Sequence, residues 1–193
     1  MSTSTAPATA PTVGTPVPLL FDNCPIEAIM TMIIELIDRL TTHNDNIPLS
    51  HANLTRFHSR AVPGISVSDY VRRIVKYASI EKAVVLLVLV YIDRICDLHN
   101  TFTISSLTSH RFLISALTAG SKAVSDIYCT NTHFAKVGGI TLQELNLLEV
   151  EFCTMMHWRL ACNHSLLQQY YVNLVRTSPS FYLDEQGGVP AVV

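Results

Sequence analysis

The chain of 193 residues is 49% hydrophobic and 15% charged, which favours one buried core with short appendages, because a typical domain has about 100 to 150 residues. Its longest unbroken apolar run, residues 83–92, is ten residues long, about half of the roughly 20 that cross a bilayer as a helix. The net charge of −2 lacks the basic excess with which proteins usually bind nucleic acid. We therefore expect neither a membrane nor a nucleic acid as partner.

The first 18 residues contain four prolines and five threonines but no charged side chain. This composition lacks the basic and apolar regions of a signal peptide and predicts a disordered leader. The five cysteines are odd in number and far apart, so no disulfide framework is indicated. A reducing compartment, the cytosol or the nucleus, is expected.

The distribution of proline and glycine separates a long central region from the two ends of the chain. None of the nine prolines lies between Pro63 and Pro179, and residues 64–177 contain only four glycines. A β-sandwich or barrel needs turn residues about every 8 to 12 positions. The central region is therefore predicted to be all-α.

The first expected helix covers residues 25–40, where apolar side chains recur at steps of three and four. Asp22 or Asn23 is available as its cap. Residues 47–65 hold two prolines and a glycine among few aliphatic side chains, and predict a long connection. The next helix begins at Ser66, which forms a capping box with Asp69.

Residues 79–98 are apolar on all sides in their middle, as is typical of a helix at the centre of a bundle. A short apolar run also suits a buried strand, which is the second interpretation of residues 83–92. Ser105 or Ser106 then caps a helix that ends near Asp126. Gly120, within that helix, suggests a close crossing with a neighbour.

The last third of the chain predicts a short turn at residues 132–137 that ends at two glycines, 138 and 139. Thr141 and Glu144 form a second capping box, which opens a helix to about residue 157. One further helix covers residues 163–175, and residues 178–193 are expected to be a flexible tail.

Sequence motifs of common enzymes are missing. Thr118-Ala119-Gly120-Ser121-Lys122 differs from a phosphate-binding loop in its glycine spacing and lies in mid-helix. No serine-hydrolase, zinc-protease or dinucleotide-binding signature is found. We therefore expect no catalytic residues and no cofactor.

Cys153, His157, Cys162 and His164 are the one cluster with a metal-like composition. Cysteine and histidine four positions apart lie on one helical face, but the remaining spacing matches no common zinc pattern. Cysteine is often buried and histidine often ends helices, and this structural explanation of the cluster is the preferred one. We predict no metal site.

Two charged residues are placed more suggestively. Glu149 falls within the apolar stripe of its helix, so its carboxylate needs a partner or a place near an edge. Lys122 aligns with Ser115 and Thr118 on the polar side of its helix and could point at another molecule. A solvated lysine and an internally satisfied glutamate are equally compatible with the spacing.

Residues 65–160 closely resemble the cyclin box of the Pho-type cyclins, also called P- or U-type. The resemblance rests on strings in one unbroken order: ISV (65–67), DY (69–70), RI (73–74), KY (76–77), YIDR (91–94), SHRFL (109–113), SK (121–122), Asn131, AKVGG (135–139) and ELNLLE (144–149). Together these strings are far more specific than any single short motif.

The resemblance implies an all-α fold, a single five-helix cyclin box with an additional N-terminal helix and a short C-terminal helix. The implied role is to bind and activate a cyclin-dependent kinase of the Pho85 kind, without catalysis by the chain itself. In cyclins the third and fifth box helices receive the αC helix of the kinase, and the positions that grip its backbone match Lys122 and Glu149. A cyclin-fold transcription or DNA-binding adaptor is the alternative, although such proteins usually have two boxes and basic faces.

The resemblance also implies an internal ion pair, Arg73 with Asp93, although Arg72 is an equally good partner by spacing. Asp93→Ala is therefore expected to destabilise the box. Two departures limit the likeness: Ala123-Val124-Ser125-Asp126 replaces the Phe-Glu-Glu that follows the lysine in many cyclins, and Arg72-Arg73-Ile74-Val75 replaces a substrate-docking string. No docking groove is expected there.

The expected organisation is a leader (1–18), an N-terminal helix and connection (19–65), the box (66–160), a C-terminal helix (161–177) and a tail (178–193).

Overall fold

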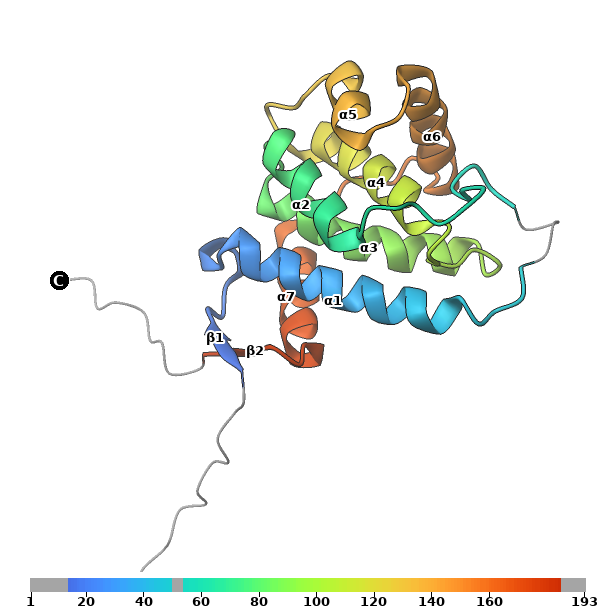
Figure 1. The fold of residues 1–193 in the computed structure, drawn as a ribbon. Helices are drawn as coiled ribbons and strands as arrows, with labels where there is room; N and C mark the ends of the chain where they lie inside the picture. The colour runs from blue at the N-terminus through green and yellow to red at the C-terminus, as the bar shows by residue number, and fades with distance from the viewer. Residues whose placement is uncertain (1–13, 50–53, 185–193) are drawn as a thin grey trace, which may run out of the picture.

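The computed structural model describes residues 14–49 and 54–184. Within them the chain forms seven α-helices, one 3-10 turn and two short strands (Figure 1). The elements are β1 (Thr15–Val17), η1 (Phe21–Asn23), α1 (Ile26–Asn44), α2 (Val67–Tyr77), α3 (Lys82–Leu98), α4 (Ser109–Val124), α5 (Asn131–Gly138), α6 (Leu142–Met155), α7 (His164–Thr177) and β2 (Phe181–Leu183). The predicted all-α fold is confirmed, with α2 to α6 as five box helices between α1 and α7. None of the described helices has the length and apolarity needed to span a membrane.

Helix α3 is the centre of the bundle. Every residue from 84 to 92 is buried, and α3 packs against α1, α4 and α7. The strand interpretation of residues 83–92 is therefore wrong. Gly120 of α4 allows the predicted close crossing, since an added Cβ would lie 3.2 Å from Val84 Cγ1 and 3.4 Å from Tyr91 Cε2.

Side-chain caps set the starts of α2 and α6. The amide of Asp69 donates to Ser66 Oγ over 3.0 Å, and the Ser66 hydroxyl donates to Asp69 Oδ2 over 2.7 Å. The amide of Glu144 likewise donates to Thr141 Oγ1 over 3.1 Å. The Glu144 carboxylate does not complete this box but accepts from Arg111 of α4 over 2.6 Å, which ties α6 to α4.

The caps predicted for α1 and α4 are wrong. Pro25 is the N-cap of α1 and makes no side-chain bond, because the chain first makes the η1 turn. The N-cap of α4 is Thr108, whose hydroxyl instead accepts from the amide of Ser105 over 2.8 Å. The extra turn formed by residues 105–108 delays the helix by about three residues.

The connection between α1 and α2 contributes a core residue that the sequence did not suggest. Phe57 is fully buried and its ring centroid lies 5.6 Å from Phe102, 6.0 Å from Phe112 and 6.4 Å from Phe152. Edge-to-face contacts at such distances stabilise beyond the buried area alone. The Phe57 side chain therefore packs the connection against the helical bundle.

The two ends of the described chain meet in a parallel sheet, with Thr15 opposite Phe181 and Val17 opposite Leu183. Figure 1 shows both strands side by side at the lower left, next to the lower end of α7. The predictions of a disordered leader and a flexible tail are thus wrong for residues 14–18 and 178–184, because backbone pairing and the burial of Val17 order them. The rest of both predictions, residues 1–13 and 185–193, lies outside the described residues.

A buried histidine links α4 to the start of α2. His110 Nε2 lies 2.9 Å from the carbonyl oxygen of Ile65, so this nitrogen carries the proton, and the ring lies 5.0 Å from that of Tyr70. Burial lowers the pKa of His110 and the nearby Arg73 guanidinium lowers it further, although the bond to Ile65 opposes them. The imidazole is therefore held neutral in the folded protein.

The folded protein should lose stability as the pH falls below about 6.5, the ordinary histidine pKa, because the unfolded chain then takes up a proton that folded His110 resists. Urea unfolding at pH 7.5, 6.5 and 5.5 measures the effect. His110→Gln retains a donor toward Ile65 but does not titrate, so its unfolding free energy should fall less steeply with pH. Equal pH dependence in the parent and the variant would contradict this assignment.

Candidate functional site

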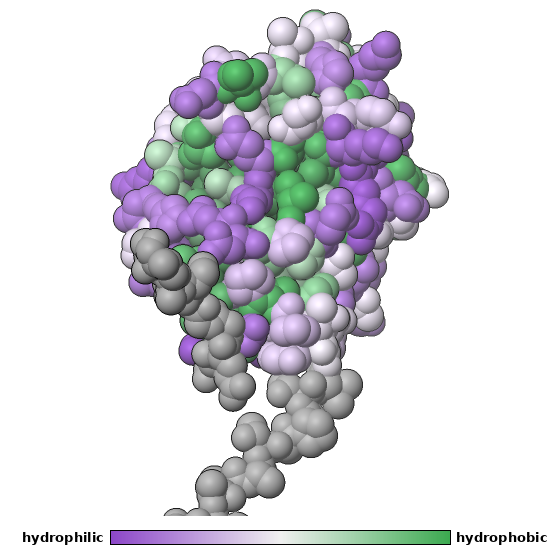
Figure 2. Space-filling model, turned by 90° about the vertical axis from the view of Figure 1, so that its left-hand side faces the viewer, coloured by the Kyte–Doolittle hydropathy of each residue, from purple (hydrophilic) through white to green (hydrophobic). Residues whose placement is uncertain are grey.

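Exposed apolar side chains occur at the end of α4, in the connection to α5 and on α6. Ile127 is 89% exposed, and the others are Val124, Tyr128, Leu147 and Val150. Figure 2 views the side that carries α2 and the α4–α5 connection, and shows a band of hydrophobic side chains between hydrophilic ones; α6 lies on the far side in this view. An apolar surface with a polar surround is typical of a protein interaction site.

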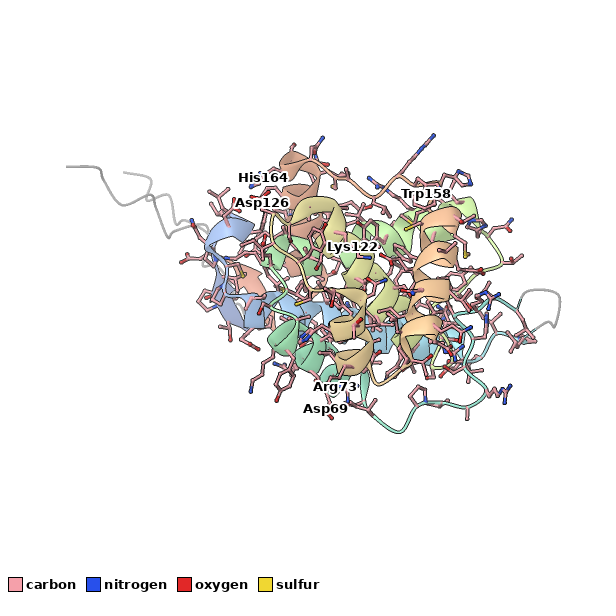
Figure 3. All side chains as sticks on the ribbon, turned by 90° about the horizontal axis from the view of Figure 1, so that it is seen from above. Asp69, Arg73, Lys122, Asp126, Trp158 and His164 are labelled. Atoms are coloured by element: carbon pink, nitrogen blue, oxygen red, sulfur yellow. The ribbon has the colours of Figure 1, made fainter. Side chains whose placement is uncertain are left out.

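Lys122 of α4 and Glu149 of α6 form an ion pair. Helices α4 and α6 pack against each other, and Lys122 Nζ lies 2.6 Å from Glu149 Oε1. The lysine side chain is 32% exposed and that of the glutamate 16%. Figure 3 shows Lys122 between the two helices. The predicted need of Glu149 for a partner is thus met inside the chain.

Asn131, the first residue of α5, completes the cluster. Its Nδ2 donates to Glu149 Oε2 over 2.7 Å and to Asn146 Oδ1 over 2.8 Å. Sequence reasoning included Asn131 only as part of a string and gave it no role. The signal that could have found it is the position of Asn146, one helical turn before Glu149 on the same face.

The cluster retains hydrogen-bonding capacity for another molecule. The ammonium group has three donors, of which Glu149 takes one. The carboxylate has about four acceptor positions, and Lys122 and Asn131 occupy two of them. Donors and acceptors side by side suit the carbonyl and amide groups of a partner's backbone, such as those left free at a helix end.

The prediction of a polar, solvent-facing side on α4 is wrong. Ser115 and Thr118 are fully buried, and the Ser115 hydroxyl donates to the carbonyl of Arg111 one turn earlier. The side of α4 that carries them packs into the bundle, where short hydroxyl side chains are tolerated. Lys122, one turn later, reaches the surface because its side chain is long.

The predicted ion pair between Arg73 and Asp93 is not formed among the described residues. Asp93 Oδ2 accepts from the hydroxyl of Tyr170 on α7 over 2.9 Å. Burial, followed by this bond, raises the pKa of Tyr170 to about 12, so the hydroxyl stays a donor. The expected cost of Asp93→Ala therefore loses its basis, since no buried cation is left behind.

The two arginines have other neighbours. The Arg73 guanidinium lies 5.3 Å from the centre of the Tyr70 ring, and Figure 3 places it at the edge of the molecule near Asp69. Its buried Nε has no hydrogen-bond partner in the described part of the chain. Arg72, the alternative partner, pairs with Glu27 of α1 over 2.8 Å. The contact of Arg72 comes from α1, which lies outside the residues that resemble the box.

The four residues of the metal-like cluster have separate surroundings. His164 pairs with Asp22 over 2.6 Å, and the ring of His157 lies 6.3 Å from that of His99. Burial raises the pKa of the Cys153 thiol and the Glu149 carboxylate raises it further, which disfavours a metal-binding thiolate. Within residues 14–49 and 54–184, no group of three or more possible ligands is arranged to hold a metal ion.

Comparison with known proteins identifies the fold. The profile of the family named Cyclin matches residues 27–160. The chain is 41% identical over 167 residues to the Nuc-1 negative regulatory protein preg of Neurospora crassa, an alignment that covers 85% of this chain and 35% of that protein. It is 36% identical over 147 residues to the PHO85 cyclin PHO80 of Saccharomyces cerevisiae, covering 74% of this chain and 50% of the relative.

A plant relative is matched over more of its own length. Cyclin-U2-1 of Arabidopsis thaliana is 33% identical over 158 residues, which cover 80% of this chain and 71% of the relative. The chain spans about a third of the Neurospora protein and half of the yeast one. With the five-helix box between α1 and α7, these matches show that the chain belongs to the cyclin family, among the Pho-type cyclins.

Proposed function

We propose that this chain is the regulatory subunit of a cyclin-dependent kinase of the Pho85 kind, and that it performs no phosphate transfer itself. The observation that carries the proposal is the Lys122–Glu149 pair, since it joins α4 and α6, the third and fifth box helices, at the positions expected to grip the kinase. We call the surface formed by Lys122, Asn131, Glu149 and the five exposed apolar residues named above the α4–α6 face.

The α4–α6 face suits the αC helix of a kinase in both polarity and chemistry. Exposed side chains such as Ile127 and Val150 supply apolar area, and the charged pair supplies donors and acceptors for backbone groups. A protein kinase is active only when the αC glutamate reaches the strand lysine that positions the ATP phosphates. The chain would hold αC in that position and leave the chemistry to the kinase.

An interface of this kind can supply the free energy needed to shift a kinase into its active state. Shifting a kinase from about 1% to 99% active requires a preference of about 5.5 kcal/mol for the active state. Interfaces of standard size bury about 1,600 Å², and only the part of the binding energy that differs between the two kinase states drives the shift. Hydrophobic area supplies affinity, whereas the charged pair sets the register.

Titration of the purified chain into a purified Pho85-type kinase tests the proposal. Phosphorylation of a peptide substrate should rise from the background of the kinase alone and saturate at one chain per kinase. The chain without kinase should transfer no phosphate. Unchanged kinase activity, together with no detectable binding in calorimetry, would overturn the proposal.

We also propose that the chain works in the cytosol or nucleus. All five cysteines lie in the described residues and are free thiols, which fits a reducing compartment. Microscopy of a fluorescent fusion tests this, and accumulation in a secretory compartment would contradict it.

A further inference from the structure

One carboxylate fixes the turn that leads from α7 into β2. Glu35 of α1 accepts from Ser178 Oγ over 3.1 Å through Oε2 and from Ser180 Oγ over 2.5 Å through Oε1. Ser178 is the C-cap of α7, and its amide donates to the carbonyl of Val175. We call β1, β2 and residues 178–180 the terminal clasp.

The terminal clasp also contains both places in the sequence where a hydroxyl residue directly precedes proline. These are Thr15-Pro16 in β1 and Ser178-Pro179 before β2. Ser178 is in the extended conformation, with φ −74° and ψ 135°, as residues before proline prefer. Thr177 and Pro179, on either side of it, are exposed. Proline-directed protein kinases accept serine or threonine in this extended context.

We propose that Ser178 is a phosphorylation site for a proline-directed protein kinase, and that its modification opens the terminal clasp. In the reaction Ser178 Oγ attacks the γ-phosphorus of ATP, the Oγ–P bond forms as the bond to ADP breaks, and the hydroxyl proton passes to the catalytic aspartate of the kinase. The proposal is independent of which kinase the α4–α6 face binds.

The phosphate would meet repulsion where the hydroxyl now donates a hydrogen bond. It carries a charge of about −1.5 to −2 at pH 7, beside the Glu35 carboxylate and at the C-terminal end of α7, where the helix dipole also disfavours negative charge. Arg39, one helical turn from Glu35, donates to the carbonyl of Thr177 over 3.0 Å. Phosphorylation removes the hydroxyl proton that Glu35 accepts and adds repulsion from its carboxylate, and both effects break the bond that fixes the turn, although Arg39 attracts the phosphate.

Besides the turn, the sheet is supported by the burial of Val17 and by Phe181 and Leu183, which pack against the core. Each strand has three residues, and a two-stranded sheet is marginally stable by itself. Beyond its own ladder, the sheet is joined by two backbone bonds of 2.9 Å, from the amide of Thr15 to Ser180 and from that of Asp184 to Val17. Modification of Ser178 should therefore separate β2 from β1.

The test uses the full chain with Thr15→Ala, which removes the second hydroxyl-proline pair. An active mitogen-activated protein kinase with magnesium and ATP supplies the phosphate, and mass spectrometry locates it. Phosphate on Ser178 is expected, with amide hydrogen exchange at positions 15, 17 and 181–184 faster by about tenfold or more, since a bond to a charged group is lost. Exchange in α3 should not change.

Two further variants separate recognition from repulsion. Pro179→Ala keeps the hydroxyl and its bond to Glu35 but should prevent phosphorylation. Glu35→Gln keeps an acceptor but removes the negative charge, so its phosphorylated form should exchange more slowly in the clasp than the phosphorylated Glu35 protein. The proposal is overturned if Ser178 stays unmodified while a Ser-Pro control peptide is consumed, or if stoichiometric phosphorylation leaves exchange in both strands unchanged.

Discussion

Lys122→Met and Glu149→Gln should each weaken binding of a Pho85-type cyclin-dependent kinase by about 2 to 5 kcal/mol, roughly 30-fold or more in Kd. Each change leaves a similar volume but removes the charge that would grip the kinase backbone. Isothermal titration calorimetry measures the effect, and circular dichroism should show the same helix content as the parent. Unchanged Kd in both variants would contradict the proposed role of the pair.

Two controls distinguish binding from a merely structural ion pair. Arg72→Met breaks another ion pair between two helices, that of Arg72 on α2 with Glu27 on α1, which is more exposed, and it should leave Kd unchanged. The combined exchange Lys122→Glu and Glu149→Lys can restore the attraction between α4 and α6 while reversing the polarity presented to the kinase. Stability should then recover but binding should not. Full recovery of binding would show that the pair acts only within the chain.

Phe57→Ala should lower the free energy of unfolding by about 3 to 5 kcal/mol, a loss typical of a core aromatic residue although Phe57 lies in an irregular connection. Its ring contacts those of Phe102, Phe112 and Phe152, and the cavity left behind is enclosed by aromatic side chains that cannot easily move inward. Urea denaturation followed by circular dichroism gives the difference.

Leu54→Ala is the matched control in the same connection. Leu54 is 48% exposed, so its removal should change stability by less than about 0.5 kcal/mol. Equal unfolding free energies for Phe57→Ala and Leu54→Ala would show that Phe57 does not anchor the connection to the bundle.

Local patterns in the sequence predicted most of the helices. Helical spacing and the lack of proline between Pro63 and Pro179 located six of the seven described α-helices, whereas α5 was predicted only as a short turn. The hydroxyl-acid spacing at Ser66 predicted its cap. Such signals depend on neighbours within one turn. The burial of Phe57 and the pairing of β1 with β2 depend on residues far away in the sequence, so no local pattern indicated them.

In the candidate site, too, the sequence identified residues but not the contacts that depend on tertiary packing. Resemblance to the cyclin box selected Lys122 and Glu149, but their 2.6 Å contact with each other follows only from the packing of α4 on α6. The same likeness suggested Arg73 with Asp93, and here the structure differs because Tyr170 of α7 bonds the carboxylate. Helix α7 lies outside the box, so reasoning confined to the box could not include it.

The pairing of β1 with β2 allows the sheet itself to be observed. The strands are parallel, so Gly14 before β1 and Asp184 after β2 lie at opposite ends of a sheet three residues long. Figure 1 shows this sheet at the lower left, whereas α5 and α6 lie at the top. A pair of fluorophores attached at positions 14 and 184 would report separation of the strands as a fall in energy transfer.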